Sequence, residues 1–163
     1  MTNTRNFIPI NIAVLTVSDT RLLDNDKSGD ILESRIKKSG HTLADRLIVP
    51  DEKETIVKVL EKWIADKDTD VILSTGGTGL TGRDVTVEAH KQLYDKEIDA
   101  FQIVFSIVSM NKIGTSAIQS RACAGVASGT YLFALPGSPS ACVDAWDEIL
   151  VFQFDYRHLP CNF

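Results

Sequence analysis

Cysteine is scarce in this sequence and follows no recognisable pattern. The 163 residues include three cysteines, Cys123, Cys142 and Cys161, an odd number without a CxxC pair. This usage argues against a disulfide framework and against a thiolate zinc site. It is typical of a protein that works in a reducing compartment.

Histidine is equally scarce, and its spacing excludes further kinds of site. His41, His90 and His158 match neither HxH nor HExxH, so we expect no structural or catalytic zinc. Ser18 and Ser138 lie outside any GxSxG nucleophile elbow, which leaves little support for nucleophilic catalysis. The histidines fall at a helix end, within a helix and near the tail of the expected elements, and we predict that they are surface residues.

Long hydrophobic runs and basic clusters are also lacking. No apolar stretch approaches the ~18 residues needed to span a bilayer, and residues 1–11 lack the pattern of a secretory signal. Lys and Arg total 17 against 22 Asp and Glu, giving a net charge of -5, with no basic stripe to neutralise a phosphate backbone. We therefore expect a cytoplasmic protein that binds neither nucleic acid nor membranes.

The composition present is that of an ordinary globular protein. Hydrophobic residues make up 44% and charged residues 24% of the chain, and a chain of this length can bury roughly 70% of its unfolded surface. We expect residues 1–163 to form a single domain, with a core over about residues 11–150 and an appended tail over residues 155–163.

Short apolar runs alternate with amphipathic segments along the chain. The expected strands are 11–17, 43–49, 71–74 and 132–135, and the expected helices are 28–39, 52–65, one after Thr86, one after Ile98 and one that contains Cys142 to Leu150. Residues 120–126 are a further strand candidate whose direction the pattern leaves open. The alternation predicts an α/β fold with a mostly parallel sheet covered by helices on both faces, and with the more polar strand 43–49 near an edge.

Parallel strands place the segments that follow them at one edge of the sheet, where open α/β folds bind ligands. The candidate binding segments are Ser18-Asp19-Thr20, Pro50-Asp51, Thr75 to Asp84 and Pro136 to Ser140. Together they supply three carboxylates, two glycine-containing turns and several hydroxyls. This mixture suits a phosphate-bearing ligand and its divalent cation.

The glycine-rich segment Thr75-Gly76-Gly77-Thr78-Gly79 is the clearest signal for such a ligand. Glycines permit positive φ and let backbone N–H groups approach an anion closely, so the segment predicts a phosphate-binding loop. Residues 77–82 match GxGxxG formally, but they follow the third strand and Arg83-Asp84 comes where a dinucleotide helix should run; no Walker A lysine follows either. A tight strand-to-helix turn without a ligand is the alternative.

Two carboxylates from separate elements are candidates for holding the cation. Asp51 and Asp84 each follow a strand or its loop, and carboxylate oxygens are suitable ligands for Mg²⁺. The alternatives are a helix N-terminal carboxylate for Asp51 and a turn-forming hydrogen bond for Asp84. Asp19 is open to the same alternative, a cap on a local turn.

Pro136-Gly137-Ser138 ends one strand and precedes a helix, and this makes it a second candidate anion site. Ser138 is a suitable N-cap residue and Pro139 a suitable first helical residue, so free N–H groups point outward. An efficient helix start explains the same residues without a ligand.

Two motifs in this order carry a resemblance to a known family. Ser74 to Gly79 (STGGTG) with Arg83 to Thr86 (RDVT), followed by Leu135 to Pro139 (LPGSP), resemble the molybdopterin-binding family of molybdenum cofactor biosynthesis proteins, which includes molybdopterin adenylyltransferase and the gephyrin G domain. The likeness covers about residues 11–150. The segments 113–117 and 120–122 and the end of the chain, 158–163, resemble the protein B branch of the family more than its proven adenylyltransferases.

The resemblance implies a three-layer α/β/α fold, a trimer or hexamer, and transfer of the adenylyl group of Mg-ATP to molybdopterin. By position, Asp51 and Asp84 match family carboxylates implicated in catalysis and metal binding. Thr75 to Gly79 match the phosphate-binding loop, and Pro136 to Ser138 match the second ligand loop. Ser18 and Asp19 lie in the first of the strand-following segments and complete the predicted binding residues.

The sequence departs from the family pattern in ways that favour a second function. Members commonly carry Gly-Phe-Gly-Glu and a nearby Arg where this chain has Ala100 to Ile103 and Ser106, and a proline is replaced by Val87. A binding or assembly protein without turnover is therefore the alternative, and a generic nucleotide-binding domain is a third reading. The apolar residues Phe101, Val104, Phe105 and Val108 predict self-association.

Overall fold

The computed structural model describes residues 5–158 and confirms the alternation of strands and helices. The strands are β1 (Asn11–Val17), β2 (Thr42–Val49), β3 (Val71–Thr75), β4 (Lys96–Glu97), β5 (Cys123–Ala127) and β6 (Thr130–Leu135). The helices are α1 (Lys27–Lys38), α2 (Lys53–Ala65), α3 (Thr86–Lys91), α4 (Asp99–Ile113), α5 (Pro139–Ala145) and α6 (Val151–Gln153). A π-helical segment, Trp146–Leu150, joins α5 to α6, and short 3-10 turns lie at Leu23–Asn25, Gly114–Gln119 and Tyr156–His158.

The six strands form one mixed, mostly parallel sheet in the order β2-β1-β3-β6-β5-β4. The first four strands of that order are mutually parallel, and β2 lies at an edge as expected. The strand candidate 120–126 is β5, which runs antiparallel to β6. Its direction follows from the tight turn between them, where Ser128 (φ 49°) and Gly129 (φ 86°) adopt positive φ. The two-residue strand β4 was not predicted.

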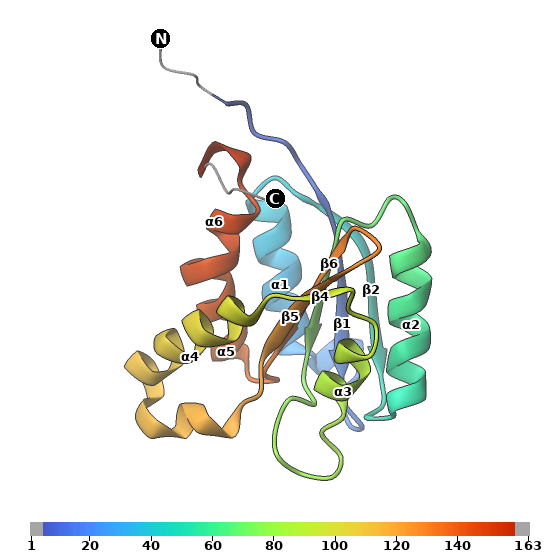
Figure 1. The fold of residues 1–163 in the computed structure, drawn as a ribbon, viewed down its shortest axis with the longest axis vertical. Coiled ribbons are helices and arrows are strands. Elements are labelled where there is room, and N and C mark those ends of the chain that lie inside the picture. The colour runs from blue at the N-terminus through green and yellow to red at the C-terminus, as the bar shows by residue number, and fades with distance from the viewer. Residues whose placement is uncertain (1–4, 159–163) are drawn as a thin grey trace.

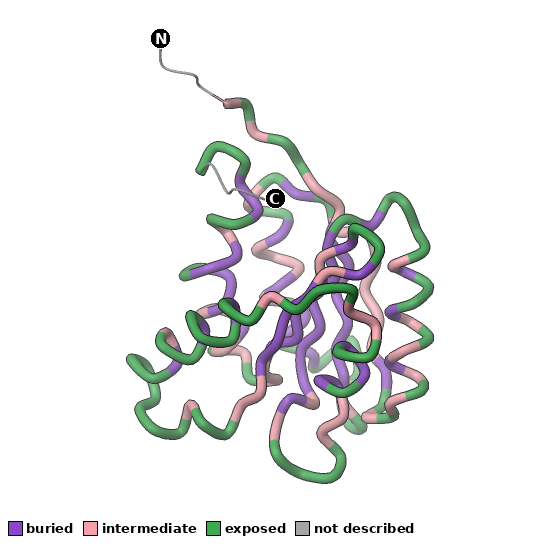
Figure 2. The backbone as a smooth tube through the Cα atoms, viewed as in Figure 1, coloured by how far each residue is buried: buried purple, intermediate pink, exposed green. Residues whose placement is uncertain are grey.

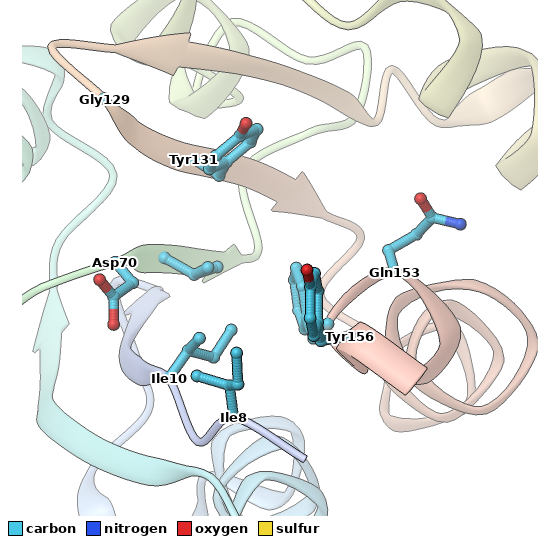
Figure 3. A pocket seen from close by; sticks show the side chains of 9 residues that line it. Ile8, Ile10, Asp70, Gly129, Tyr131, Gln153 and Tyr156 are labelled. Atoms are coloured by element: carbon cyan, nitrogen blue, oxygen red, sulfur yellow. The ribbon is translucent and has the colours of Figure 1, made fainter. Parts of the chain in front are cut away.

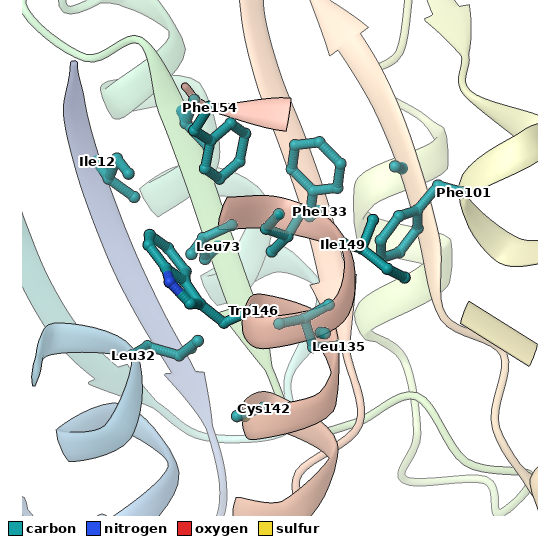
Figure 4. Packing of buried hydrophobic residues seen from close by; sticks show 14 of the residues in the cluster. Ile12, Leu32, Leu73, Phe101, Phe133, Leu135, Cys142, Trp146, Ile149 and Phe154 are labelled. Carbon is teal, nitrogen blue, oxygen red and sulfur yellow. The ribbon is translucent and has the colours of Figure 1, made fainter. Parts of the chain in front are cut away.

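Helices cover both faces of the sheet, which gives the expected α/β/α layers (Figure 1). The central strands β1, β3 and β6 are mostly buried between the helical layers, while the edge strands β2 and β4 are more exposed (Figure 2). On one face, α1, α4 and α5 pack around Phe133, Trp146 and Phe154 (Figure 4). On the other face, α2 and α3 pack around a cluster that includes Leu60 and Trp63. Strand β1 is buried over most of its length because it lies between these two clusters.

The aromatic residues Trp63, Phe101, Phe105 and Trp146 are all buried. Phe101 and Phe105 pack within their own chain, whereas Val104 on the same helix is 44% exposed. Four further large apolar side chains of α4 are also exposed: Ile103, Ile107, Met110 and Ile113. Self-association through this face stays a prediction.

Cys123 and Cys142, the cysteines of the described region, are free and buried. Cys161 and the end of the tail lie outside the described residues. Within residues 5–158, no helix has the length and apolar character that crossing a membrane requires.

Two histidines are buried, which corrects the prediction that all three lie at the surface. His41 is 6% exposed and His90 is fully buried. His90 lies in a hydrogen-bonded chain: its Nε2 is 2.7 Å from Ser74 Oγ, and its Nδ1 is 3.0 Å from Tyr94 Oη. Sequence pattern missed this burial because a polar residue on the six-residue helix α3 is compatible with an exposed face. Of the three, only His158 is exposed.

Burial of His90 makes the protein sensitive to acid in a defined window. Burial lowers the pKa of His90 from 6.5 to about 3, so between these values the unfolded chain binds a proton here that the folded protein does not. The free energy of unfolding should therefore fall by about 1.4 kcal/mol for each pH unit below 6.5. Burial also lowers the pKa of His41 and adds to the slope.

The variant His90→Gln isolates this effect because glutamine does not titrate. We expect the free energy of unfolding, measured with urea between pH 6.5 and pH 5, to depend less steeply on pH in the variant. The slope should be smaller by the equivalent of about one bound proton. A slope equal to that of the unaltered protein would contradict the assignment.

Candidate functional site

The carboxyl ends of the four parallel strands meet at one edge of the sheet, as the shared direction predicted. Hydrogen bonds join the segment that follows one strand to the end of a neighbouring strand. Ser18 N–H donates to Val49 O at 2.9 Å, and Gly76 N–H donates to Leu135 O at 3.0 Å. The long loop after β3 leaves from this edge, at the lower end of the sheet in Figure 1. The predicted site residues therefore lie on one rim, although they are far apart in sequence.

Asp19 joins the ends of β1 and β2 to the loop after β3. Its Oδ1 accepts a hydrogen bond from Asp51 N–H at 3.0 Å, and its Oδ2 accepts from Arg83 Nε at 3.1 Å and Nη2 at 2.6 Å. Hydrogen bonds from Arg83 and from the Asp51 backbone lower the pKa of Asp19. Asp19 thus bridges three segments, a wider role than the local turn cap that was its alternative.

Asp51 faces the glycine loop, which we define as residues 75–79. Its Oδ1 lies 3.1 Å from the position that a Cβ on Gly77 would occupy. Partial burial, and then the negative charge of Asp19, raise the pKa of Asp51. Helix α2 begins at Lys53 with Glu52 as its N-cap residue, so the Asp51 side chain is not the cap of that helix. An ionised carboxylate in this position gains from a nearby cation.

Asp84 lies on the same rim, but its own loop already uses part of its carboxylate. Asp84 Oδ2 accepts hydrogen bonds from Thr81 N–H at 2.9 Å and from Thr81 Oγ1 at 2.7 Å. Partial burial opposes ionisation, but the hydrogen bonds from Thr81 outweigh it and lower the pKa of Asp84. The turn-forming role is therefore present in the structure. The charge of Asp84 also contributes to the raised pKa of Asp51.

The glycine loop lies against the end of β1 and needs glycine at two positions. Gly76 has φ +99° and Gly77 has φ +67°. A Cβ on Gly76 would lie 2.2 Å from the carbonyl oxygen of Val17. This backbone conformation places the loop directly on the rim, where its N–H groups can approach an anion.

The glycine loop and the second loop, residues 136–138, are fastened to each other. Thr75 Oγ1 donates to Pro136 O at 2.8 Å, and a Cβ on Gly137 would lie 3.2 Å from Gly76 Cα. Ser138 caps α5 by accepting from Ala141 N–H at 3.2 Å. The side chains of Thr75 and Ser138 therefore have structural partners, and the helix-start alternative for Ser138 is present.

A cleft of about 400 Å³ runs between the two loops and the end of α4. Seven predicted or motif residues line it: Gly77, Thr78, Gly79, Asp84, Pro136, Gly137 and Ser138. The remaining residues of its lining were not predicted: Ser109, Ile113, Ser116, Ala117, Gln119, Ser120 and Ala141. The run of small and hydroxyl residues over 114–120 was the available signal in the sequence. Ser18, Asp19 and Pro50 line a separate depression of about 390 Å³.

Two arginines that sequence reasoning passed over brace the loops. Arg121 Nε donates to Gly79 O at 2.8 Å and its Nη2 donates to Asp84 O at 3.1 Å, while the guanidinium pairs with Glu88. Arg21 Nη2 donates to Gly137 O at 2.8 Å. These hydrogen bonds are all made to backbone carbonyl oxygens of the loops. No local pattern marks either residue, because each acts on a segment distant in sequence.

Ser18 shapes the turn that brings Arg21 to the second loop. Its Oγ accepts hydrogen bonds from Thr20 N–H at 3.3 Å and from Arg21 N–H at 3.2 Å. The Ser18 hydroxyl is thus engaged within the protein. Its predicted contact with a ligand stays a prediction.

The oxygen atoms of this rim fit a hard divalent cation. Proteins commonly hold Mg²⁺ through one or two carboxylates together with substrate phosphates. Within residues 5–158, no group of three or more His, Cys, Asp and Glu side chains is placed to hold a metal ion. A cation bound at Asp51 would therefore take part of its coordination from phosphate oxygens of a ligand.

A second cavity, of about 220 Å³, lies at the opposite ends of the strands (Figure 3). Its lining is mostly apolar and includes Ile8, Ile10, Tyr131 and Tyr156, with Asp70 at its margin. None of the predicted site residues lines it. Its chemistry does not suit a polyanionic ligand, so the rim with the glycine loop is the better candidate.

Comparison with known proteins gives a consistent result over most of the chain. Residues 13–155 match the family described as "probable molybdopterin binding domain". The molybdenum cofactor biosynthesis protein B of Escherichia coli K12 is 46% identical over 157 residues, which cover 96% of this chain and 92% of the relative. A protein of Methanocaldococcus jannaschii named "probable molybdopterin adenylyltransferase" is 43% identical over 140 residues, covering 82% of this chain and 83% of the relative.

The fold agrees with that of a solved protein that carries the same name as the Escherichia coli relative. A crystal structure of molybdenum cofactor biosynthesis protein B superposes with a TM-score of 0.88 at 37% identity, covering 91% of this chain and 93% of the other. Residues 13–155, which match the family, include both loops of the rim.

Proposed function

Because the chain belongs to the molybdopterin-binding family of molybdenum cofactor biosynthesis proteins, we propose that it adenylylates molybdopterin with Mg-ATP. The terminal phosphate oxygen of molybdopterin attacks the α-phosphorus of ATP. The bond between the α-phosphorus and the bridging oxygen breaks, and pyrophosphate leaves. The products are adenylyl-molybdopterin and pyrophosphate. We further propose that the protein acts as a single domain in the cytoplasm.

The observation that carries this proposal is the meeting of two glycine-containing loops with an ionisable carboxylate at one rim. Gly76 and Gly137 lie side by side, and Asp51 faces the adjoining Gly77. A reaction between two phosphate compounds needs two adjacent anion-binding segments, and the loops offer such a pair. The cleft between them, of about 400 Å³, is of the size that small-molecule sites have.

The reaction makes modest demands on acid and base groups. The nucleophile is already an anionic phosphate, so the protein must orient two polyanions and neutralise the charge that develops on the leaving group. Backbone N–H groups of Gly77 to Gly79 supply hydrogen bonds to phosphate in this scheme. Arg83, whose side chain is 64% exposed and pairs with Asp19, is a cation within reach of the same rim. Asp51 and Asp84 are proposed to hold Mg²⁺, which would offset phosphate charge when bound.

A binding or assembly protein of the same pathway, without turnover, is the second candidate. Ile103 and Ser106 on α4 occupy positions where a charged pair is common in the family, and Ile103 is 61% exposed. An apolar side chain there cannot contact a ligand phosphate as a charged one can. A generic nucleotide-binding domain would bind ATP without affinity for the pterin.

We also propose that the protein forms a homo-oligomer, a trimer or a hexamer. The support is the exposed apolar face of α4, which includes Ile103, Ile107 and Met110. Faces of this kind commonly mark protein interfaces. Sedimentation as a monomer at micromolar concentration would contradict this.

The experiment that separates the candidates is incubation of the purified protein with ATP, Mg²⁺ and molybdopterin, followed by analysis for the adenylylated product. The enzyme proposal expects adenylyl-molybdopterin and an equal amount of pyrophosphate. Pterin binding without product would favour the binding or assembly protein. ATP binding without pterin binding would favour the generic nucleotide-binding domain.

A further inference from the structure

Two hollows of the rim, the cleft and the separate depression, share a wall. The cleft lies between the glycine loop and the second loop, and the depression lies beside the ends of β1 and β2. Arg21 lines the depression, and its Nη2 donates at 2.8 Å to the carbonyl oxygen of Gly137, which lines the cleft. A ligand in the cleft is therefore next to the depression, and two ligands bound in the two hollows would lie close together.

The ion pair between Arg83 and Asp19 lies at the same boundary. Arg83 precedes Asp84, which lines the cleft, and its partner Asp19 lines the depression. Arg83 Nε and Nη2 donate to Asp19 Oδ2 at 3.1 Å and 2.6 Å. The side chains of Arg83 and Asp19 are 64% and 40% exposed, so water reaches both partners. A ligand that extends from one hollow toward the other therefore meets this pair.

The cleft itself offers no positively charged side chain to a phosphate-bearing ligand. Among the described residues that line it, the one ionisable side chain is the carboxylate of Asp84. Proteins that catalyse phosphoryl transfer use arginine, lysine or metal ions to offset the charge of the transferred group. Positive charge from the side chains of this protein must therefore come from beside the cleft.

Arg83 is the arginine of this region that the fold uses least. Arg21 and Arg121 donate to carbonyl oxygens of the loops, and Arg46 pairs with three acidic side chains. The side chains of Arg21, Arg121 and Arg46 are 29%, 31% and 11% exposed, against 64% for Arg83. Within residues 5–158, the hydrogen bonds of the Arg83 side chain go to Asp19 alone. Its guanidinium can therefore change partner once that single pair opens.

Exchange of Asp19 for a phosphate group is favourable in charge and in geometry. An exposed ion pair contributes little to stability, because water solvates both partners when the pair is open. A phosphate monoester carries a charge of about −1.5 to −2 near neutral pH, whereas a carboxylate carries a single negative charge. The planar guanidinium donates two parallel hydrogen bonds to a phosphate group. The pair with Asp19 therefore positions Arg83 in the free protein and opens when a phosphate group competes for it.

We propose that Arg83 leaves Asp19 and pairs with a phosphate group of the ligand where the two hollows meet. Arg83 then selects phosphorylated ligands, and Asp19 keeps it in position until one binds. The proposal rests on the proposed function, which provides two sources of such a group: the phosphates of ATP and the terminal phosphate of molybdopterin. It goes beyond that function because it assigns Arg83 a change of partner on binding.

The test compares two variants that break the same ion pair from opposite sides. Arg83→Gln removes the positive charge. Asp19→Asn removes the negative charge, and its amide oxygen can still accept from Asp51 N–H. Isothermal titration in EDTA measures the affinity of each variant for ATP and, separately, for molybdopterin.

We expect the two variants to change the affinity in opposite directions. Arg83→Gln should weaken binding about tenfold, because a charge-assisted hydrogen bond to phosphate is lost. Asp19→Asn should strengthen binding about threefold, because Arg83 is released in advance and a negative charge leaves the rim. The ligand that shows these opposite changes is the one whose phosphate Arg83 contacts.

A purely structural role for the pair predicts a different pattern. If the pair only held the loop in place, both variants would change the affinity in the same direction. The matched control is the exposed ion pair of Arg35 and Asp147, which joins α1 to the π-helical segment. Arg35→Gln and Asp147→Asn should leave both affinities unchanged. All of these variants should melt close to the unaltered protein, because each breaks one exposed pair.

Each result decides the proposal. Opposite changes with either ligand support it. Unchanged binding in Arg83→Gln, or weaker binding in both variants, overturns it while the proposed function stands. Weaker binding in Arg83→Gln without stronger binding in Asp19→Asn overturns the exchange of partners. If Arg83→Gln fails to fold, Asp19→Asn decides alone: stronger binding supports the proposal, and equal or weaker binding overturns it. An unaltered protein that binds neither ligand contradicts the proposed function and this proposal together.

Discussion

Replacing Gly76 by alanine is expected to destabilise the protein by about 3 kcal/mol and to abolish ligand binding at the rim. Gly76 has φ +99°, a backbone conformation that costs an L-residue about 1–2 kcal/mol. The new Cβ would also lie 2.2 Å from Val17 O, a backbone atom of the buried strand β1. That atom cannot move without disturbing the centre of the sheet, so the loop itself must shift.

Gly82 provides the matched control for this prediction. It lies in the long segment between β3 and α3, but a Cβ there meets nothing within 4 Å, and its φ is not in the positive range. Gly82→Ala should change the free energy of unfolding by less than about 0.5 kcal/mol. Urea unfolding of both variants provides the comparison. Equal stability of Gly76→Ala and Gly82→Ala would show that the close approach to β1 is not maintained in solution.

Replacing Asp51 by asparagine should lower adenylyl transfer about 100-fold or more without loss of stability. The rate falls because the variant lacks the charge proposed to hold the cation against the developing charge of the reaction. Stability is kept because burial and the charge of Asp19 raise the pKa of Asp51. A carboxyl whose pKa is higher in the folded state than in the unfolded chain opposes folding when it is ionised, so a neutral amide removes that opposition.

Asp84→Asn is the informative comparison for Asp51→Asn. Hydrogen bonds from Thr81 lower the pKa of Asp84 against the effect of burial, so this carboxylate stabilises the fold above its unfolded pKa, and that contribution is lost as the pH falls through the lower folded value. We expect Asp84→Asn to lose stability at neutral pH, measured by urea unfolding. Full turnover in Asp51→Asn would contradict its proposed role.

Much of the fold followed from the sequence because burial and strand direction leave clear patterns. The apolar run Asn11–Val17 is buried on both faces, and parallel strands then place Asp51 and Gly77 on the same rim. The direction of β5 could not be predicted, since it depends on the turn at Ser128 and Gly129. Strand β4, Lys96–Glu97, is too short and polar to leave a pattern.

The site was predicted in position but not in the use of its side chains. Sequence patterns indicate which residues share an edge, but hydrogen bonding between distant segments depends on distances of a few ångströms. Thr75 fastens two loops, and Asp84 closes a turn. Arg121, which lies just before β5, donates to the carbonyl oxygen of Gly79 in the glycine loop.

The fastening of the two loops bears on the thermodynamics of recognition. Gly76 N–H donates to Leu135 O, Thr75 Oγ1 donates to Pro136 O, and Gly137 packs against Gly76. Segments already joined in this way have little conformational freedom left to lose when a guest arrives. The conformational entropy of these loops is therefore lost when the chain folds and not when a substrate binds. A change in the conformation of either loop also alters the other.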